Sequence, residues 1–490
     1  MKYSSISILC AALTASASAF VSPRTVVPIA HENGFCPTTT AAAANQGRCR
    51  SNYSFLKAAQ EAAVEGVPAV KSQSEEDSLD VVIHDLLKIS NFVYAFANVR
   101  RIVKVNEGKT RKKSTGWFSS EEYTVAFDTP ALIRTQDGAQ EQSKDKLLKY
   151  VITPDAIKEF MEKNRKWFKE PEGGGNWEFD KTVTEKTEPF ILEAAVDAAT
   201  KDNMKIVDYD DEFCEGKGGL VYGVVVNLTR KWITVAFRGT IGSTDINADR
   251  DFRLDHESLF ESEDDIFVSG GKPGTHMGFT TYLCDEKKGD QDGRKCLDRI
   301  LSCVNEEFKS NPDVVGKDFD LYVTGHSLGG GLANLFAFKA AQLKAKDDES
   351  VKYLPEKITA LTFASPTVGN DDYNKEFQYL EKKGNLRHVR VANEGDVVPT
   401  NNIIPPASFA IKGNTKLYTQ NGVNLHLHPD KEVEVDYRAT KSCWSQLSVT
   451  KSLGAHMVAE YYKRVELPAK KKVYQQTVEE LYSAAGDFTN

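Results

Sequence analysis

The second half of the chain alternates between short apolar runs and longer amphipathic segments. Two β-branched, apolar runs, at 221–226 and 232–237, are joined by a short polar turn and predict a β-hairpin. The strand-like and helix-like segments that follow in alternation are 319–324, 329–343, 358–364, 371–383 and 388–392. This alternation predicts an α/β fold with a mainly parallel central sheet and helices on both of its faces.

The region before residue 219 has a different pattern of apolar and polar residues. Apolar residues spaced by three and four positions predict a long helix that begins near Asp80 and continues to Val99. The stretch at 106–120 is basic and polar and is predicted to be a loop, and the glycine run at 173–175 is a second break. At the other end of the chain, residues 466–490 are interpreted as a C-terminal tail.

The N-terminus has the composition of a targeting segment. Residues 1–19 combine Lys2, an apolar stretch at 6–13 and small residues before a cleavage site after Ala19, which predicts a cleaved secretory signal. Residues 20–75 are interpreted as a low-complexity, transit-like or pro-region, because their first thirty residues are poor in acids and rich in Ser, Thr and Ala. The junction Ala-Ser-Ala-Phe resembles the signal-to-transit boundary of plastid proteins in algae with complex plastids. Secretion and import into a complex plastid both stay open as destinations.

Composition and charge narrow the class of protein. With 490 residues, 40% hydrophobic and 27% charged, the chain is neither disordered nor collagen-like. Its 62 basic and 70 acidic side chains give a net charge of −8, which opposes nonspecific binding to nucleic acid. Beyond the signal, no uncharged apolar run reaches the roughly 18 residues that span a bilayer, so no transmembrane anchor is expected.

The cysteines and histidines do not predict a metal site or a cofactor. Apart from Cys10 in the signal, the cysteines are odd in number and scattered, without a CxxC pair, so neither a disulfide framework nor a zinc site is expected. One bridge, between Cys284 and Cys296, stays open. The alternating His426 and His428 lack a third ligand for a metal.

A catalytic motif lies between a predicted strand and a predicted helix. Residues 325–329 read Gly-His-Ser-Leu-Gly and match G-x-S-x-G. A serine on such a tight turn is held above the sheet, and the glycines let strand and helix pack closely. The helix N-terminus directs N–H groups at a developing oxyanion. Ser327 is therefore the candidate nucleophile.

A serine nucleophile needs a general base and a carboxylate that orients the base. In this kind of fold the acid and then the histidine follow the serine along the chain. His456 stands in a loop or first helical turn and is favoured over His428, which lies on a short strand. Asp396 lies in the loop after the strand at 388–392 and is favoured over the neighbouring Glu394.

With these residues placed, the chain resembles the class 3 (fungal-type) lipases of the α/β-hydrolase superfamily. Six blocks carry the resemblance in order: Val235–Thr240, His276–Phe279, Val323–Gly330, Phe363–Asn370, Asn393–Pro399 and His456. The resemblance implies a hydrolase domain over 76–465, with its motif-bearing core at 219–465. It also implies an oxyanion hole formed by the backbone N–H groups of Thr240, helped by its hydroxyl, and of Leu328.

In this family the segment after the oxyanion residue is a lid, an amphipathic helix that opens at a lipid surface. Here residues 241–265 carry nine acidic side chains against two arginines. Their apolar residues form only a thin stripe: Ile246, Phe252, Leu254, Leu259 and Phe260. A small apolar surface predicts weak interfacial activation and partly soluble or galactolipid-like esters as substrates. An ordinary solvated loop, without bearing on the substrate, is the alternative.

The leading hypothesis is a serine hydrolase of carboxylic esters that acts on acyl lipids, like a triacylglycerol lipase, through an acyl-enzyme. A phospholipase A1 or galactolipase and a feruloyl-type esterase are alternatives of the same class. A noncatalytic binding protein with the same fold is an alternative of another class. The expected partner is an acyl-lipid or ester substrate with transient contact to a lipid surface, without nucleic acid, metal or cofactor.

Overall fold

The computed structural model describes residues 76–484 except 115–119, 129–153, 170–177, 180–203, 212–219, 241–250, 252, 269, 285–294, 311–314, 316–317, 397, 400–417, 438–453 and 468–470. The predicted signal (1–19) and transit-like region (20–75) lie outside the described residues. Within the described part of the chain, no helix combines the length and the apolar character that crossing a bilayer requires.

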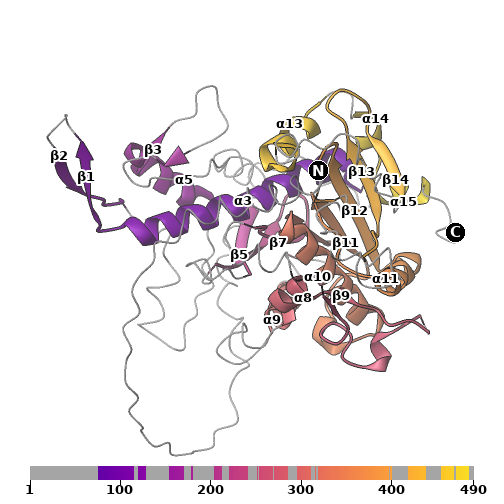
Figure 1. The fold of residues 1–490 in the computed structure, drawn as a ribbon. Coiled ribbons are helices and arrows are strands. Elements are labelled where there is room, and N and C mark those ends of the chain that lie inside the picture. The colour runs from indigo at the N-terminus through magenta and orange to yellow at the C-terminus, as the bar shows by residue number, and fades with distance from the viewer. Residues whose placement is uncertain are drawn as a thin grey trace, which may run out of the picture.

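An eight-stranded sheet forms the centre of the molecule, in the order β14-β13-β12-β11-β10-β7-β6-β5 (Figure 1). Its strands are β5 (Met204–Asp210), β6 (Tyr222–Asn227), β7 (Trp232–Phe237), β10 (Asp320–His326), β11 (Ile358–Phe363), β12 (Leu386–Asn393), β13 (Val423–Leu427) and β14 (Glu434–Tyr437). The strands from β7 to β13 pair in parallel, whereas β5, β6 and β14 pair antiparallel to their neighbours. The predicted hairpin is β6–β7, and the predicted α/β-hydrolase fold with a mainly parallel sheet is confirmed.

Helices from the middle of the chain cover one face of this sheet. They are α8 (Met277–Cys284), α9 (Cys296–Ser310), α10 (Leu328–Ala345) and α11 (Asp371–Lys383). The predicted helices at 329–343 and 371–383 correspond to the last two. Local chemistry fixes the ends of α11, because the Asn370 side chain accepts from the Tyr373 N–H and Gly384 ends the helix with φ +86°.

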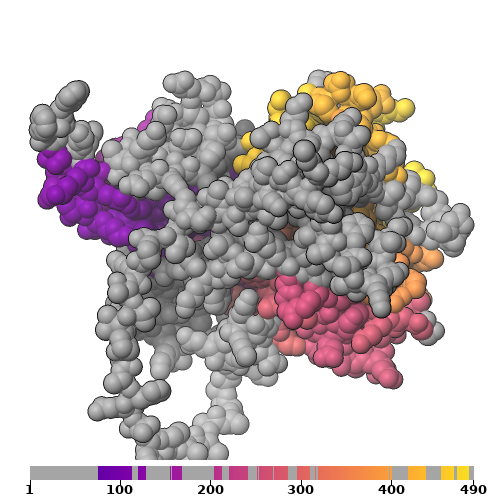
Figure 2. Space-filling model, in the orientation of Figure 1, coloured from indigo at the N-terminus to yellow at the C-terminus, as the bar shows by residue number. Residues whose placement is uncertain are grey.

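Helices from the two ends of the described chain cover the other face. They are α3 (Leu79–Asn106), α13 (Val458–Val465), α14 (Lys471–Tyr474) and α15 (Val478–Ala484). The predicted long helix is α3, which runs across the sheet in indigo in Figure 1. Side chains of α3, α13, α14 and α15 share one apolar core with this side of the sheet. In the space-filling view, the yellow C-terminal residues and the pink residues of the opposite face appear at different sides of the surface (Figure 2).

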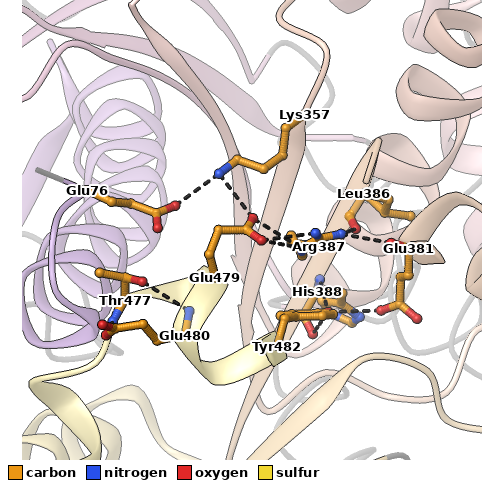
Figure 3. A network of polar contacts seen from close by, with 10 residues as sticks. All are labelled: Glu76, Lys357, Glu381, Leu386, Arg387, His388, Thr477, Glu479, Glu480 and Tyr482. Carbon is orange, nitrogen blue, oxygen red and sulfur yellow. Dashed lines mark hydrogen bonds and ion pairs between the residues drawn. The ribbon is translucent and has the colours of Figure 1, made fainter. Parts of the chain in front are cut away.

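The interpretation of residues 466–490 as a tail is wrong. Val478 and Leu481 are 1% and 2% exposed, and the N–H of Leu79 at the start of α3 donates to Gln476 O at 2.7 Å. The Tyr482 hydroxyl accepts from the His388 N–H at 2.5 Å and lies 2.9 Å from the His388 carbonyl oxygen (Figure 3). Because α14 and α15 are only four and seven residues long, they hold too few apolar positions to show a helical period.

The predicted loop at 106–120 contains the first strand of a hairpin and the first residue of the second. Strands β1 (Thr110–Ser114) and β2 (Ser120–Thr124) pair antiparallel just beyond the end of α3 (Figure 1). All but one of the side chains of β2 are exposed, so these strands lack the apolar alternation that reveals a strand in a sequence. Near them lie α5 (Pro154–Lys163), η1 (Arg165–Trp167), β3 (Phe168–Lys169) and β4 (Glu178–Phe179). The glycine run at 173–175 lies outside the described residues.

Candidate active site

Ser327 stands on the turn between β10 and α10. Its φ of 58° is a left-handed conformation that a residue with a side chain seldom adopts. A Cβ on Gly325 would lie 2.3 Å from the Gly329 carbonyl carbon, and one on Gly329 would lie 2.2 Å from the Phe237 carbonyl oxygen. The strand and the helix therefore approach so closely that only glycine fits at positions 325 and 329, as the motif predicts.

The structure brings Ser327, His456 and Asp396 together. His456 Nε2 lies 2.9 Å from Ser327 Oγ, and His456 Nδ1 lies 3.0 Å from both carboxylate oxygens of Asp396. Asp396 is 1% exposed, in the loop after β12, while His456 lies in a short helical turn before α13. A base that contacts both a hydroxyl and a buried carboxylate has the geometry of a serine-hydrolase triad.

Two residues that were not among the predicted site residues hold the loop that carries Asp396. The Tyr461 hydroxyl donates to Asp396 Oδ2 at 2.8 Å and accepts from the Asn393 N–H at 3.1 Å. The Asn393 side chain donates to Ala455 O at 2.9 Å, next to the histidine. Burial, reinforced by Asp396, raises the pKa of Tyr461, so its hydroxyl keeps its proton. The sequence does not indicate this role for Tyr461, because a tyrosine among apolar helix positions looks like a core residue.

Glu394 and His428, the alternatives to Asp396 and His456, contact each other instead of Ser327. Glu394 Oε2 lies 3.1 Å from His428 Nδ1, and His428 Nε2 lies 3.5 Å from Glu434 Oε2. Although burial opposes it, the hydrogen bond with His428 lowers the pKa of Glu394. His426 lies beside His428, with ring centroids 4.8 Å apart. Among the described residues, no three or more His, Cys, Asp or Glu side chains are arranged to hold a metal ion.

The segments that carry the two predicted oxyanion donors are neighbours. Leu328 is the first residue of α10, where backbone N–H groups have no partner within the helix. Thr240 follows Gly239, and a Cβ on Gly239 would lie 2.4 Å from the His326 carbonyl oxygen. The loop after β7 therefore packs directly against the turn that holds Ser327, which is the arrangement that an oxyanion hole requires.

The predicted lid is only partly described. Ile246 and Phe252 lie outside the described residues, and Leu254 lies in β8 (Leu254–Asp255), which pairs with β9 (Thr275–His276). Leu259 and Phe260 are 1% and 7% exposed and belong to the core on the α10 side of the sheet. These two side chains pack inward, whereas Glu257 and Glu261, which flank them along the chain, are exposed.

Polar contacts fasten the end of this segment to α10 and α11. The Glu376 carboxylate accepts from the N–H groups of Phe267 and Val268, both at 2.8 Å. The Lys339 ammonium donates to Leu259 O at 2.9 Å, and the Lys346 ammonium donates to Asp265 at 2.7 Å. In this structure, these contacts attach residues 259–268 to the helices on that face of the sheet.

The disulfide left open by the sequence does not form. Cys284 and Cys296 are both buried thiols. Burial raises the pKa of the Cys284 thiol to about 12, so this group stays protonated and unreactive.

Comparison with known proteins assigns the central part of the chain to a family. Residues 234–405 match the family model described as "Lipase (class 3)". These residues include five of the six blocks quoted above, and the structure places the sixth, His456, against Ser327. This part of the chain belongs to the class 3 lipase family.

Curated relatives of this chain include plant proteins. It is 36% identical over 174 residues to phospholipase A1-Igamma1, chloroplastic, of Arabidopsis thaliana, covering 35% of this chain and 32% of that one. It is 30% identical over 173 residues to phospholipase A1-Igamma2, chloroplastic, of the same plant, covering 35% and 31%. It is 30% identical over 205 residues to phospholipase A1-II 6 of Oryza sativa subsp. japonica, covering 41% and 46%. The aligned region thus spans less than half of each relative.

Solved structures of fungal lipases are also similar to this chain. A lipase from Rhizopus microsporus var. chinensis matches with a TM-score of 0.36 and 19% identity, covering 55% of this chain and 76% of that one. Lipase II from Rhizopus niveus matches with a TM-score of 0.37 and 20% identity, covering 54% and 82%.

Proposed function

We propose that the chain is a serine hydrolase of carboxylic esters that acts on acyl lipids. The observation that carries this proposal is the contact of His456 Nε2 with Ser327 Oγ at 2.9 Å, while His456 Nδ1 contacts the buried Asp396 at 3.0 Å. The match of residues 234–405 to the class 3 lipase family model supports an acyl lipid as the substrate.

The geometry supports an acyl-enzyme mechanism. His456 Nε2 takes the Ser327 hydroxyl proton as Oγ attacks the ester carbonyl carbon. Asp396 keeps the Nδ1–H of the imidazole in place and stabilises the imidazolium that forms. The N–H groups of Thr240 and Leu328 stabilise the oxyanion. His456 then gives the proton to the leaving alcohol, and a water activated by the same histidine releases the fatty acid from Ser327.

Labelling with a fluorophosphonate tests this proposal. We expect wild-type protein to be labelled at Ser327, and Ser327→Ala to lose labelling and at least about 1,000-fold of its esterase activity. Ser365→Ala is a matched control, because Ser365 is a buried serine whose hydroxyl contacts only Pro366 O, at 3.2 Å, among the hydrogen bonds described. Full esterase activity in Ser327→Ala would remove the mechanism.

Phospholipase A1 activity is a second candidate. It is favoured because the curated relatives described above are phospholipases A1. Purified protein should be given a mixture of triacylglycerol, phosphatidylcholine and galactolipid, and the released fatty acids and lysolipids quantified. Release of sn-1 fatty acid from phospholipid with little attack on triacylglycerol supports the second candidate, and the opposite ratio supports a triacylglycerol lipase.

We propose weak interfacial activation. The burial of Leu259 and Phe260 supports it, because it removes two apolar side chains from the surface that a lid could offer to lipid. The rate on a short-chain triglyceride is expected to rise smoothly as its concentration passes the solubility limit. A sharp jump at that limit would contradict this proposal and leave the ester hydrolase itself untouched.

We propose that residues 1–19 direct the chain into the secretory pathway and that the final compartment is a plastid. The acid-poor composition after residue 19 supports it, and two relatives are chloroplastic. A fusion of residues 1–60 to a fluorescent protein should accumulate in the plastid. Its release into the medium would instead identify a secreted protein.

A further inference from the structure

The histidine of the Gly-His-Ser-Leu-Gly motif has a role that the triad does not use. His326 precedes the candidate nucleophile, and its side chain is buried, 4% exposed. Its Nε2 lies 2.8 Å from the carbonyl oxygen of His456, and the two imidazole centroids are 4.9 Å apart. The residue next to the nucleophile thus contacts the backbone of the base.

The contacts of His326 define its tautomer. Burial, with the neighbouring His456 as the next cause, lowers the pKa of His326 to about 3, so its imidazole is neutral at the pH of most assays. A neutral imidazole carries one N–H. Because a carbonyl oxygen can only accept, Nε2 is the protonated nitrogen, and Nδ1 presents its lone pair on the other side of the ring.

Tyr94, on α3, meets that second side. Its hydroxyl lies 3.3 Å from both Nδ1 and the carbonyl oxygen of His326, so its proton faces two acceptors. The same hydroxyl would lie 1.8 Å from a Cβ placed on Gly239. One tyrosine from the long helix therefore touches both the turn that carries the nucleophile and the loop that leads to Thr240.

We propose that His326 and Tyr94 are positioning residues that hold the base in register with the nucleophile, an inference that rests on the proposed function. The backbone of His326 continues into Ser327, and its side chain holds the backbone of His456. A displacement of either part is therefore transmitted to the other. Catalysis depends on such registry, since a misplacement of about 1 Å can lower a rate about 100-fold.

Two amide substitutions separate this role from simple packing. In His326→Gln the amide nitrogen can reach the place of Nε2 and donate to the His456 carbonyl. In His326→Asn the amide reaches only the place of Nδ1, so that donor is lost. The readouts are kcat and KM on a soluble p-nitrophenyl ester and the rate of labelling of Ser327 by a fluorophosphonate.

We expect His326→Asn to lower kcat and the labelling rate about 10- to 100-fold with KM changed less than about twofold. His326→Gln should stay within about threefold of wild type, and Tyr94→Phe, which keeps the ring, should lower kcat about two- to fivefold. Circular dichroism and thermal melting check that each variant is folded. If His326→Asn does not fold, Tyr94→Phe and His326→Gln still carry the test.

The outcomes are distinct. A folded His326→Asn that is labelled at the wild-type rate overturns the proposal, and so does a folded His326→Gln as slow as His326→Asn. If His326→Asn is not folded, wild-type kcat in Tyr94→Phe overturns it. The acid limb of the pH profile of kcat/KM should coincide in wild type and His326→Gln, because the group that this variant removes does not titrate there. Absence of labelling in wild-type protein would instead refute the proposed function.

Discussion

The two faces of the central sheet are built from different parts of the chain. On one face lie α8 to α11, which connect the strands from β7 to β12 and fall within the residues that match the family model. On the other lie α3 and α13 to α15, which come from outside those residues. Yet the second face supplies Tyr94, which contacts His326 next to the candidate nucleophile, and Tyr461, which contacts Asp396. The residues that match the family model therefore do not supply all the contacts that hold the candidate active site.

The largest effect is expected from removing part of the second face. Deletion of residues 471–490 takes away four side chains that are at most 5% exposed: Tyr474, Val478, Leu481 and Tyr482. Truncating a large buried side chain costs roughly 2–5 kcal/mol, so their joint loss is comparable to the whole stability of a domain, about 5–15 kcal/mol. We expect little soluble, folded protein by circular dichroism.

Deletion of residues 485–490 alone is the matched control, since it keeps all residues of α14 and α15. It should leave the melting temperature close to that of the full chain. If the protein with the longer deletion melts at the same temperature as the control protein, α14 and α15 do not stabilise this face of the sheet.

This contrast also explains how far the sequence could be interpreted. Strands such as β10 and β11 and the helix α10 have continuous apolar runs or strong periods, because they are buried between two layers. Ser327, Asp396 and His456 were found because glycines and a strand end mark their positions. The roles of Tyr94 and Tyr482 were not predicted. A tyrosine whose hydroxyl makes a buried hydrogen bond and a tyrosine that only packs its ring look the same in a sequence pattern. The burial of Leu259 and Phe260 in the core was not predicted, because two adjacent apolar residues among acidic ones give no period that shows which way they face.

Each face also contains one buried, neutral histidine, and acid should destabilise both. Burial lowers the pKa of His326, which contacts α3, and of His388, which contacts α10, to about 3 each. An exposed histidine in the unfolded chain has a pKa near 6.5, so between about pH 6.5 and 3 the unfolded state binds more protons than the folded state. Stability is therefore complete above about pH 6.5 and falls with decreasing pH by about 1.4 kcal/mol per unit for each histidine.

Urea denaturation at pH 6.5, 5.5 and 4.5 measures this slope. Carboxylates titrate in the same range, so the informative quantity is the difference between variants. His326→Gln and His388→Gln should each flatten the slope by about 1.4 kcal/mol per pH unit, whatever their stability at neutral pH. An unchanged slope in His388→Gln would mean that this histidine is already protonated in the folded protein.

A smaller effect is expected when one buried hydroxyl is removed from each face. The Tyr482 hydroxyl contacts the N–H and carbonyl of His388 and lies 2.9 Å from Glu381 Oε1. The Tyr373 hydroxyl has one described contact, with Asn334 Oδ1 at 2.8 Å. Leaving buried polar groups unsatisfied costs about 1–3 kcal/mol, so Tyr482→Phe should cost more than Tyr373→Phe within that range. Guanidinium denaturation of both variants tests the order, and the reverse order would contradict the role assigned to α15.

The smallest effect is expected from the ion pairs at the rim of the second face. Glu479 on α15 lies 3.0 Å from Arg387 and 3.1 Å from Lys357, which also lies 2.9 Å from Glu76 (Figure 3). Because the Glu479 side chain is 36% exposed, water screens these charges, and Glu479→Gln should cost no more than about 1 kcal/mol. The same change measured in 1 M salt should cost less still. A loss above about 2 kcal/mol in Glu479→Gln would show that charge, rather than the apolar burial of Val478 and Leu481, attaches α15 to the sheet.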